Sequence, residues 1–132
     1  MARETYAESE AFTVEWDPDL EAAVIEWHTT PGGRPFREGL EALLSLIEER
    51  DATRVLADCR AFESFPDRTE WLREDWLPRF LASGVEYGAY VYPDDQLARS
   101  ELDRIARGDA DGLPNQVFAE TASEARLWLR AK

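Results

Sequence analysis

Apolar and polar residues alternate near the beginning of the chain, and this alternation predicts a pair of strands. Between Phe12 and Trp16 every second side chain is apolar, as in a strand that buries one face. A turn at residues 17–19, built around Pro18, leads into a second strand from Leu20 to Trp27. Because so short a turn joins antiparallel neighbours, we expect these two strands to form a hairpin.

Helical spacing of apolar residues follows a break at Pro31-Gly32-Gly33. One apolar stripe predicts a helix from about Pro35 to Arg50, and its members are Phe36, Leu40, Leu43, Leu44 and Ile47. Further along the chain, the pattern predicts helices at about residues 66–83, 95–107 and 121–130, and strands at 54–58, 85–92 and 116–118.

The second predicted helix carries marked signals at its ends and in its middle. Asp67 is a candidate N-cap, and Gly84 is expected to end the helix in a left-handed conformation. Pro78 lies inside the helix and is expected to kink it, because proline donates no backbone hydrogen bond. The buried side chains of this helix are expected to be Leu72, Trp76 and Phe80.

The last two predicted helices also show an apolar face. Thr121 is expected to cap the final helix, with Glu124 completing a capping box. The side chains expected to pack are Leu97, Leu102, Ile105 and Ala106 in the third helix, and Ala125, Leu127, Trp128 and Leu129 in the fourth.

The order of elements is therefore β-β-α-β-α-β-α-β-α, which is typical of the α/β class. We expect a mixed, mostly parallel sheet of about five strands with about four helices, joined by right-handed crossovers, in which only the first strand is antiparallel. The 132 residues suffice for one continuous core. We therefore expect a single domain over residues 1–132, of which residues 1–10 form a polar N-terminal tail.

Polar residues directly follow the predicted parallel strands. Ligands of such sheets bind at the carboxyl ends of the strands, and there the chain has His28 and the elbow Asp58-Cys59-Arg60. The only histidine and the only cysteine thus fall on one edge, which allows a thiolate nucleophile with an imidazole base. The alternative is a buried structural cysteine and a histidine at the rim. We favour the alternative, because Asp58 would raise the pKa of the neighbouring thiol.

Aromatic residues between the second helix and the following strand have two interpretations. Trp76 fits the apolar stripe of its helix, whereas Trp71 does not. Tyr90 alternates with apolar neighbours in the strand at 85–92. Most of this set is expected to be core, and the other interpretation is a groove for a ligand or a partner helix. Arg79, in the same helix, is instead a candidate contact for a protein partner.

The charge of the chain excludes some classes of partner. There are 28 acidic and 15 basic residues, giving a net charge of −13. Such a surface repels nucleic acids and anionic membranes. One interpretation of the acidic surface is a protein partner with a basic surface. The other is a solvated surface that keeps the protein dispersed, of the kind found in salt-loving organisms. No run of residues is apolar and long enough to span a membrane.

The few sulfur and imidazole groups also limit the chemistry. A single cysteine, Cys59, cannot form an intramolecular disulfide, and the polar N-terminus does not resemble a secretory signal, so a cytoplasmic location is expected. One histidine and one cysteine cannot complete a closed zinc site. We therefore expect neither a metal nor another cofactor.

Several of these segments resemble a small group of stand-alone bacterial STAS-like proteins, named after the domain that anti-sigma-factor antagonists share with sulphate transporters. The resemblance runs from Phe12 to Leu129. It is carried by the elbow Asp58-Cys59-Arg60 and most specifically by Trp71-x4-Trp76-x-Pro78-Arg79. It implies the STAS fold, a kinship with lipid-transfer CRAL-TRIO domains, and a branch whose members mostly have no assigned activity.

The chain departs from that family at the regulatory position. Regulatory STAS domains carry a phosphorylatable serine or threonine after the third strand, where a phosphate would face a helix N-terminus. Here Cys59 stands in that place, and no glycine follows. Ser64 and Thr69 lie nearby as possible substitutes. A phosphorylation switch of the usual kind is therefore not expected.

Three functions remain open. The first is a non-enzymatic regulatory or interaction module that binds a protein through the elbow and the Trp71–Arg79 helix. The second is a carrier of a small apolar or lipid-like ligand, held in a groove lined by Trp71, Trp76 and Tyr90. The third, which we rank last, is an enzyme that uses Cys59 and His28. An exposed edge strand would also allow a homodimer.

Overall fold

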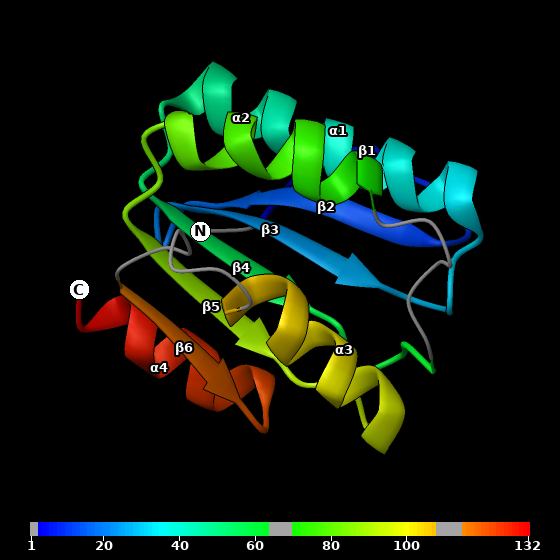
Figure 1. The fold of residues 1–132 in the computed structure, drawn as a ribbon. Helices are drawn as coiled ribbons and strands as arrows, with labels where there is room; N and C mark the ends of the chain where they lie inside the picture. Colours follow the sequence, from blue (N-terminus) through cyan, green and yellow to red (C-terminus); the bar gives the residue numbers. More distant parts are fainter. Residues whose placement is uncertain (1–2, 64–69, 108–114) are drawn as a thin grey trace.

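A single mixed sheet forms the centre of the protein, as the computed structural model in Figure 1 shows. The structure describes residues 3–63, 70–107 and 115–132. In the described residues the sheet has six strands, which lie side by side in the order of the sequence. They are β1 (Glu4–Glu8), β2 (Phe12–Asp17), β3 (Ala22–Trp27), β4 (Arg54–Asp58), β5 (Tyr87–Val91) and β6 (Asn115–Ala119).

Strand directions follow the α/β pattern. β2 pairs antiparallel with both β1 and β3, so the predicted hairpin is present. β3, β4, β5 and β6 pair in parallel, which places their carboxyl ends at one edge of the sheet. The mixed, mostly parallel α/β architecture is therefore confirmed, with β2 as the one described strand that runs against the others.

The predicted number of five strands is wrong, because part of the expected N-terminal tail forms β1. This strand is exposed over most of its length, so it lacks the apolar alternation that marks β2. Its position depends on contacts with distant residues. Glu4 accepts a hydrogen bond from Arg50 at 3.1 Å, and Arg3, directly before the strand, donates to Glu15 at 2.9 Å.

Helices pack on both faces of the sheet. They are α1 (Gly33–Arg50), the π-helix η1 (Leu72–Trp76), α2 (Leu77–Ala82), α3 (Gln96–Arg107) and α4 (Ala122–Arg130). Side chains of α1, η1, α2 and α3 join the larger core on the first face. On the second face α4 packs against β4, β5 and β6. No helix of the described chain lies over the second face of β1, β2 and β3 (Figure 1).

The α1 helix buries every residue of its predicted stripe. It also buries Gly39, which the stripe did not mark. A β-carbon at Gly39 would lie 2.5 Å from the Trp27 ring and 3.1 Å from the Phe12 ring, so the helix approaches the hairpin more closely here than any side chain would allow. This close approach fixes the distance between α1 and the first two core strands.

A π-helix accommodates Pro78 in the second helical segment. The backbone N–H of Leu77 bonds to the carbonyl of Leu72, five residues earlier, so η1 widens directly before the proline. Proline has no N–H to offer, and a wider turn is one way in which a helix adapts to it. The predicted buried residues Leu72, Trp76 and Phe80 are confirmed, and Gly84 has the expected positive φ of 102°.

Two predicted core residues are instead exposed. Leu97 is 63% exposed and Leu127 is 65% exposed. Each has the wrong phase for its helix, because α3 turns Ala98 and Leu102 inward and α4 turns Ala125 and Leu129 inward. The predicted cap of α4 is confirmed, since the Thr121 hydroxyl accepts from the N–H of Glu124 at 3.1 Å. The predicted cap at Asp67 lies outside the described residues.

Candidate functional site

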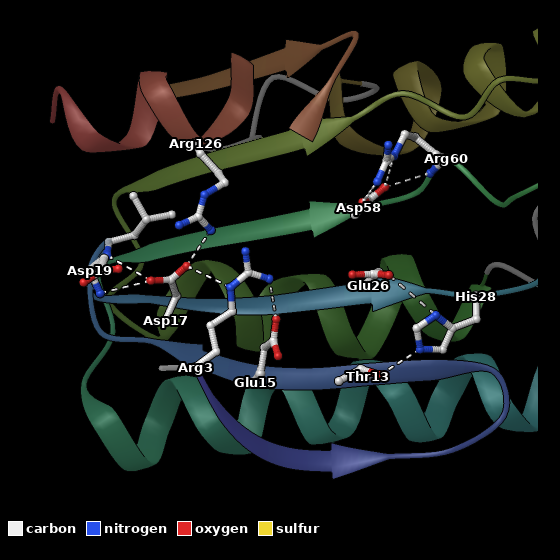
Figure 2. A network of polar contacts seen from close by, with 11 residues as sticks. Arg3, Thr13, Glu15, Asp17, Asp19, Glu26, His28, Asp58, Arg60 and Arg126 are labelled. Atoms are coloured by element: carbon white, nitrogen blue, oxygen red, sulfur yellow. Dashed lines mark hydrogen bonds and ion pairs between the residues drawn. The ribbon is translucent and has the colours of Figure 1, made fainter. Parts of the chain in front are cut away.

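The predicted site residues do not form one site. Asp58 and Arg60 lie on the second face of the sheet, at the carboxyl end of β4 (Figure 2). Trp71 and Arg79 lie on the opposite side of the sheet, beside α1. The elbow and the second helix therefore present two separate surfaces. The remaining predicted site residues pack in or against the larger core, and they are Cys59, Trp76 and Tyr90.

Core packing accounts for the buried Trp76 and the partly buried Tyr90. Trp76 stacks on Phe80 with ring centroids 4.9 Å apart, and its Nε1 donates to the backbone carbonyl of Leu40 at 2.8 Å. Tyr90 packs on Phe118 with centroids 5.2 Å apart. The described lining of the hollow beside Trp71 includes neither Trp76 nor Tyr90, and the groove of all three residues for an apolar ligand stays a prediction.

Cys59 and His28 are not brought together. Cys59 is 4% exposed and faces the larger core, where burial, with a smaller contribution from the Asp58 charge, raises the pKa of its thiol well above the ordinary value. The His28 ring lies on the other face, against Thr13. A thiol that stays protonated at neutral pH and lacks an adjacent base is a poor nucleophile.

The elbow forms a compact ion pair at the end of β4. Both Asp58 oxygens accept from Arg60, at 3.0 Å from Nε and 2.7 Å from an Nη atom, and the backbone N–H of Arg60 donates to the same carboxylate at 3.2 Å. Asp58 is 6% exposed, whereas about half of the Arg60 side chain is exposed. The pair thus satisfies a buried carboxylate and leaves one side of a guanidinium open to solvent.

A hydroxyl, an imidazole and a carboxylate lie next to this ion pair (Figure 2). Thr13 Oγ1 lies 2.7 Å from His28 Nε2, and His28 Nδ1 lies 3.7 Å from Glu26 Oε1. Sequence reasoning included His28 and missed Thr13 and Glu26. The signal for both was the hairpin register, because Thr13 and Glu26 are direct partners across β2 and β3 and share the face on which His28 lies.

Another polar cluster on this face connects the two ends of the chain. Asp17, which is 1% exposed, accepts from Arg126 at 2.5 Å and from the backbone N–H groups of Asp19 and Leu20. Burial alone would raise the pKa of Asp17, but these hydrogen bonds outweigh it and lower the pKa below its usual value. The cluster attaches α4 to the β2–β3 turn, so we assign it a structural role.

On the opposite side, α1 and the η1–α2 segment enclose an open hollow of about 420 Å³. Among the described residues of its lining Trp71 is the one aromatic, and the Arg37 guanidinium lies over the Trp71 ring, 4.6 Å from the centroid. Arg79 bonds to Glu41 and, at 2.7 Å, to Asp75. We call this the α1–α2 hollow, and its lining consists of Arg34, Arg37, Glu38 and Glu41 from α1 and Trp71, Asp75 and Arg79 from the facing segment.

Arg37 differs from the other two arginines of the α1–α2 hollow. Arg34 pairs with Glu38 at 3.1 Å, and Arg79 pairs with two carboxylates. Within the described chain, Arg37 makes no ion pair and has only the Trp71 ring as a partner. Sequence reasoning missed Arg37, because an arginine on the exposed side of a helix carries no signal of its own.

No three side chains of the histidine, cysteine, aspartate and glutamate types are placed to share a metal ion in the described chain. In the same residues, no helix combines the length and the apolar content needed to cross a membrane. Comparisons of the chain with protein-family models, curated proteins and solved structures give no match.

Proposed function

We propose that this protein is a non-enzymatic interaction module of the STAS-like type, acting in the cytoplasm, that binds a partner protein at the α1–α2 hollow. The observation that supports the proposal is the placement of Trp71. Its ring lines the hollow, while Leu72 and Trp76 of the same segment are buried in the core. Tryptophan and arginine are the residues that most often supply binding energy at protein interfaces, and here they occur as a pair.

The chemistry of the hollow favours a partner segment with two features. An apolar side chain would pack on the Trp71 ring, and a neighbouring carboxylate would pair with Arg37, which has no ionic partner in the described chain. The remaining charges of the lining already neutralise one another through the Arg34–Glu38 pair and the Arg79 pairs. Arg37 is therefore the cation of the hollow that a partner can use without breaking an existing pair.

Long-range charge adds a second condition. With a net charge of −13, the protein attracts a partner whose overall surface is basic, and this attraction acts mainly on the association rate. The carboxylate at Arg37 would then be a local contact within a basic partner. Binding that combines these effects should weaken as salt rises, because exposed charges are screened over about 8 Å at physiological ionic strength.

The elbow is not included in the proposed docking surface. Arg60 and Asp58 face away from the α1–α2 hollow, and Cys59 lies in the core where the related regulatory domains carry their serine or threonine. The two substitutes for that residue, Ser64 and Thr69, lie outside the described residues. The proposal therefore rests on the α1–α2 hollow alone and includes no phosphorylation step at Cys59, which no serine kinase can modify.

A photo-crosslinking experiment tests the docking surface. A benzophenone amino acid would replace Arg34 at the α1–α2 hollow in one variant and Leu127 on the exposed side of α4 in another, both expressed in the native host. We expect a specific crosslinked protein only from the position at the hollow. Its identity would come from mass spectrometry, and its affinity for the purified wild-type protein from calorimetry.

Matched tryptophan variants then examine the contact itself. Trp71→Ala should weaken binding of the identified partner by at least about tenfold, or 1.4 kcal/mol, as expected of an interface anchor. Trp128→Ala is the control, because Trp128 also lies beside a cation, Lys132, but on α4 at the other face. Equal affinities for wild type and Trp71→Ala would contradict the proposed site, as would equal crosslinking from both positions.

A further inference from the structure

Strand geometry brings three reactive side chains of the hairpin together on the open face of the sheet. Glu26 and His28 are two residues apart on one strand path, so they point to the same side. Thr13 is the cross-strand partner of Glu26. His28 is therefore the diagonal neighbour of Thr13, a distance that a long side chain can bridge. The backbone N–H of His28 donates to Ala11 at 2.9 Å, which extends the ladder past the end of β3.

The contacts within this group have a defined direction. The Glu26 carboxylate, 3.7 Å from Nδ1, favours the imidazole tautomer that carries its proton on Nδ1. In that tautomer Nε2 is an acceptor, so the Thr13 hydroxyl donates to it across 2.7 Å. The order is hydroxyl, imidazole and carboxylate, which is the order in which a nucleophile, its base and the group that orients the base are arranged in acyl-transfer sites.

We propose that Thr13 is an acyl-acceptor site, at which His28 activates the hydroxyl and Glu26 positions the imidazole, and that its substrates are activated acyl esters. The Thr13 oxygen attacks the carbonyl carbon and forms a new ester bond while its proton moves to His28 Nε2. The bond from the carbonyl carbon to the leaving oxygen breaks, and the leaving group departs with the electron pair. The proton on His28 then passes to solvent. No oxidant or reductant takes part.

The surroundings of the group suit an exposed acceptor. About 37% of the His28 side chain and 45% of the Glu26 side chain are exposed, so an ester can approach from solvent. Asp58, the β4 partner of Glu26, has its charge taken up by Arg60, which leaves the Glu26 carboxylate free to act on His28. On the other side, Glu8 of β1 is paired with Thr13 in the strand register. An ester with a stable anionic leaving group needs no acid to protonate that group, which is why the substrate class is restricted to activated esters.

The test is acylation of the full-length protein by p-nitrophenyl acetate, followed by intact mass measurement and peptide mapping. We expect one stable acetyl group on Thr13. Thr13→Val should abolish that adduct. Valine lacks the hydroxyl but is β-branched like threonine, so it suits the strand. Thr5→Val is the matched control: Thr5 belongs to the neighbouring strand, where it pairs with Glu15 and has no imidazole contact in the described chain. Its loss should leave acylation of Thr13 unchanged.

Three further variants separate the roles of His28 and Glu26. His28→Gln should slow acylation of Thr13 about a hundredfold, near the lower end of what general bases contribute. Glu26→Gln should lower the rate less than His28→Gln, because the imidazole loses the carboxylate that orients its ring. Glu26→Asp keeps a carboxylate and should restore part of the rate, whereas a merely structural role of Glu26 would leave the acylation rate of both Glu26 variants unchanged. Circular dichroism would confirm that each variant is folded.

Several outcomes would overturn the proposal. Wild-type protein without a stable acetyl group on Thr13 would do so, and so would modification confined to the N-terminal amine or to Lys132. An unchanged rate in His28→Gln would also reject it. Because this group lies on the face opposite the α1–α2 hollow, these results are independent of those on partner binding, and either proposal can fail without the other.

Discussion

The carboxylate of Asp17 at the end of β2 accepts a hydrogen bond at 2.5 Å from Arg126 of α4, which is 109 residues further along the chain. Asp17 is 1% exposed and Arg126 keeps 23% of its side chain exposed. The contact joins the hairpin, which forms one side of the sheet, to the helix that covers the other side. It therefore links the two ends of the chain through a nearly buried charge.

This link predicts a dependence of stability on pH. The pKa of Asp17 is lowered in the folded protein, so its contribution to the free energy of unfolding should be complete above about pH 5 and be lost as the pH falls through the folded pKa. Asp17→Asn should destabilise the protein by about 3 kcal/mol at neutral pH, since Arg126 loses its carboxylate. The variant should also lose stability less steeply than wild type in acid, which urea unfolding at neutral and acidic pH would measure.

Glu38→Gln is the control for Asp17→Asn. Glu38 pairs with Arg34 one helical turn away, and both side chains are more than half exposed. Removing that charge should change the free energy of unfolding by about 0.5 kcal/mol or less. If Asp17→Asn were equally mild, the Asp17–Arg126 contact would not hold α4 to the hairpin.

Two glycines of α1, one at its first residue and one inside the helix, offer a matched pair of variants. Gly39→Ala should destabilise the protein by about 1–3 kcal/mol, because its methyl group would lie 2.5 Å from the Trp27 ring and overpack the core. Gly33→Ala should be neutral or stabilising by up to about 1 kcal/mol, because a β-carbon there meets nothing within 4 Å and alanine favours the helix. Thermal and urea unfolding of both variants would provide the comparison. Equal effects would show that α1 does not approach Trp27 this closely.

The indole hydrogen bond of Trp76 predicts a specific loss in a conservative variant. Trp76→Phe keeps most of the ring but removes the donor to the Leu40 carbonyl and leaves space in the core. We expect it to lower the free energy of unfolding by about 2–3 kcal/mol. Trp71→Phe changes a partly buried ring that lines the α1–α2 hollow, and it should lower the free energy of unfolding by less than about 1 kcal/mol. Urea unfolding followed by far-ultraviolet circular dichroism suits both variants, and a reversed order would show that Trp76 does not connect η1 to α1.

Cys59 should be unreactive in the folded protein. Its thiol is buried and has a raised pKa, so little thiolate is present at neutral pH. We expect iodoacetamide to label Cys59 slowly in buffer and quickly in denaturing urea, as measured by intact mass. Rapid labelling of the native protein would revive the cysteine-based enzyme that the sequence left open.

How far the sequence predicted the fold depended on whether a segment buries one regular face. The α1 stripe and the η1–α2 stripe were correct residue by residue, because each packs on the core along its whole length. The phase of α3 and α4 was partly wrong. Leu97 and Leu127 are apolar but exposed, whereas the predicted Leu102, Ala125 and Leu129 face the core together with Ala98, whose small side chain carries little signal.

The candidate sites were predicted only in part for a related reason. Strand-end logic placed His28 and Asp58 at one edge of the sheet, which the parallel pairing confirms. It could not pair His28 with Thr13 instead of Cys59, because that choice depends on which face each side chain takes. Nor could it identify Arg37, whose contact with Trp71 crosses between two helices.

Local patterns of apolar residues by themselves determined that this chain alternates strands and helices in an α/β fold. Burial of one face of a strand or helix imposes a period of apolar residues that can be recognised within a short stretch of sequence. Only the tertiary structure decided the exposed strand β1, the Asp17–Arg126 pair and the group of Thr13, His28 and Glu26. Each depends on the register between segments or on contacts between residues far apart in sequence. Such contacts are selected by the packing of the whole sheet, and they leave no period in the sequence.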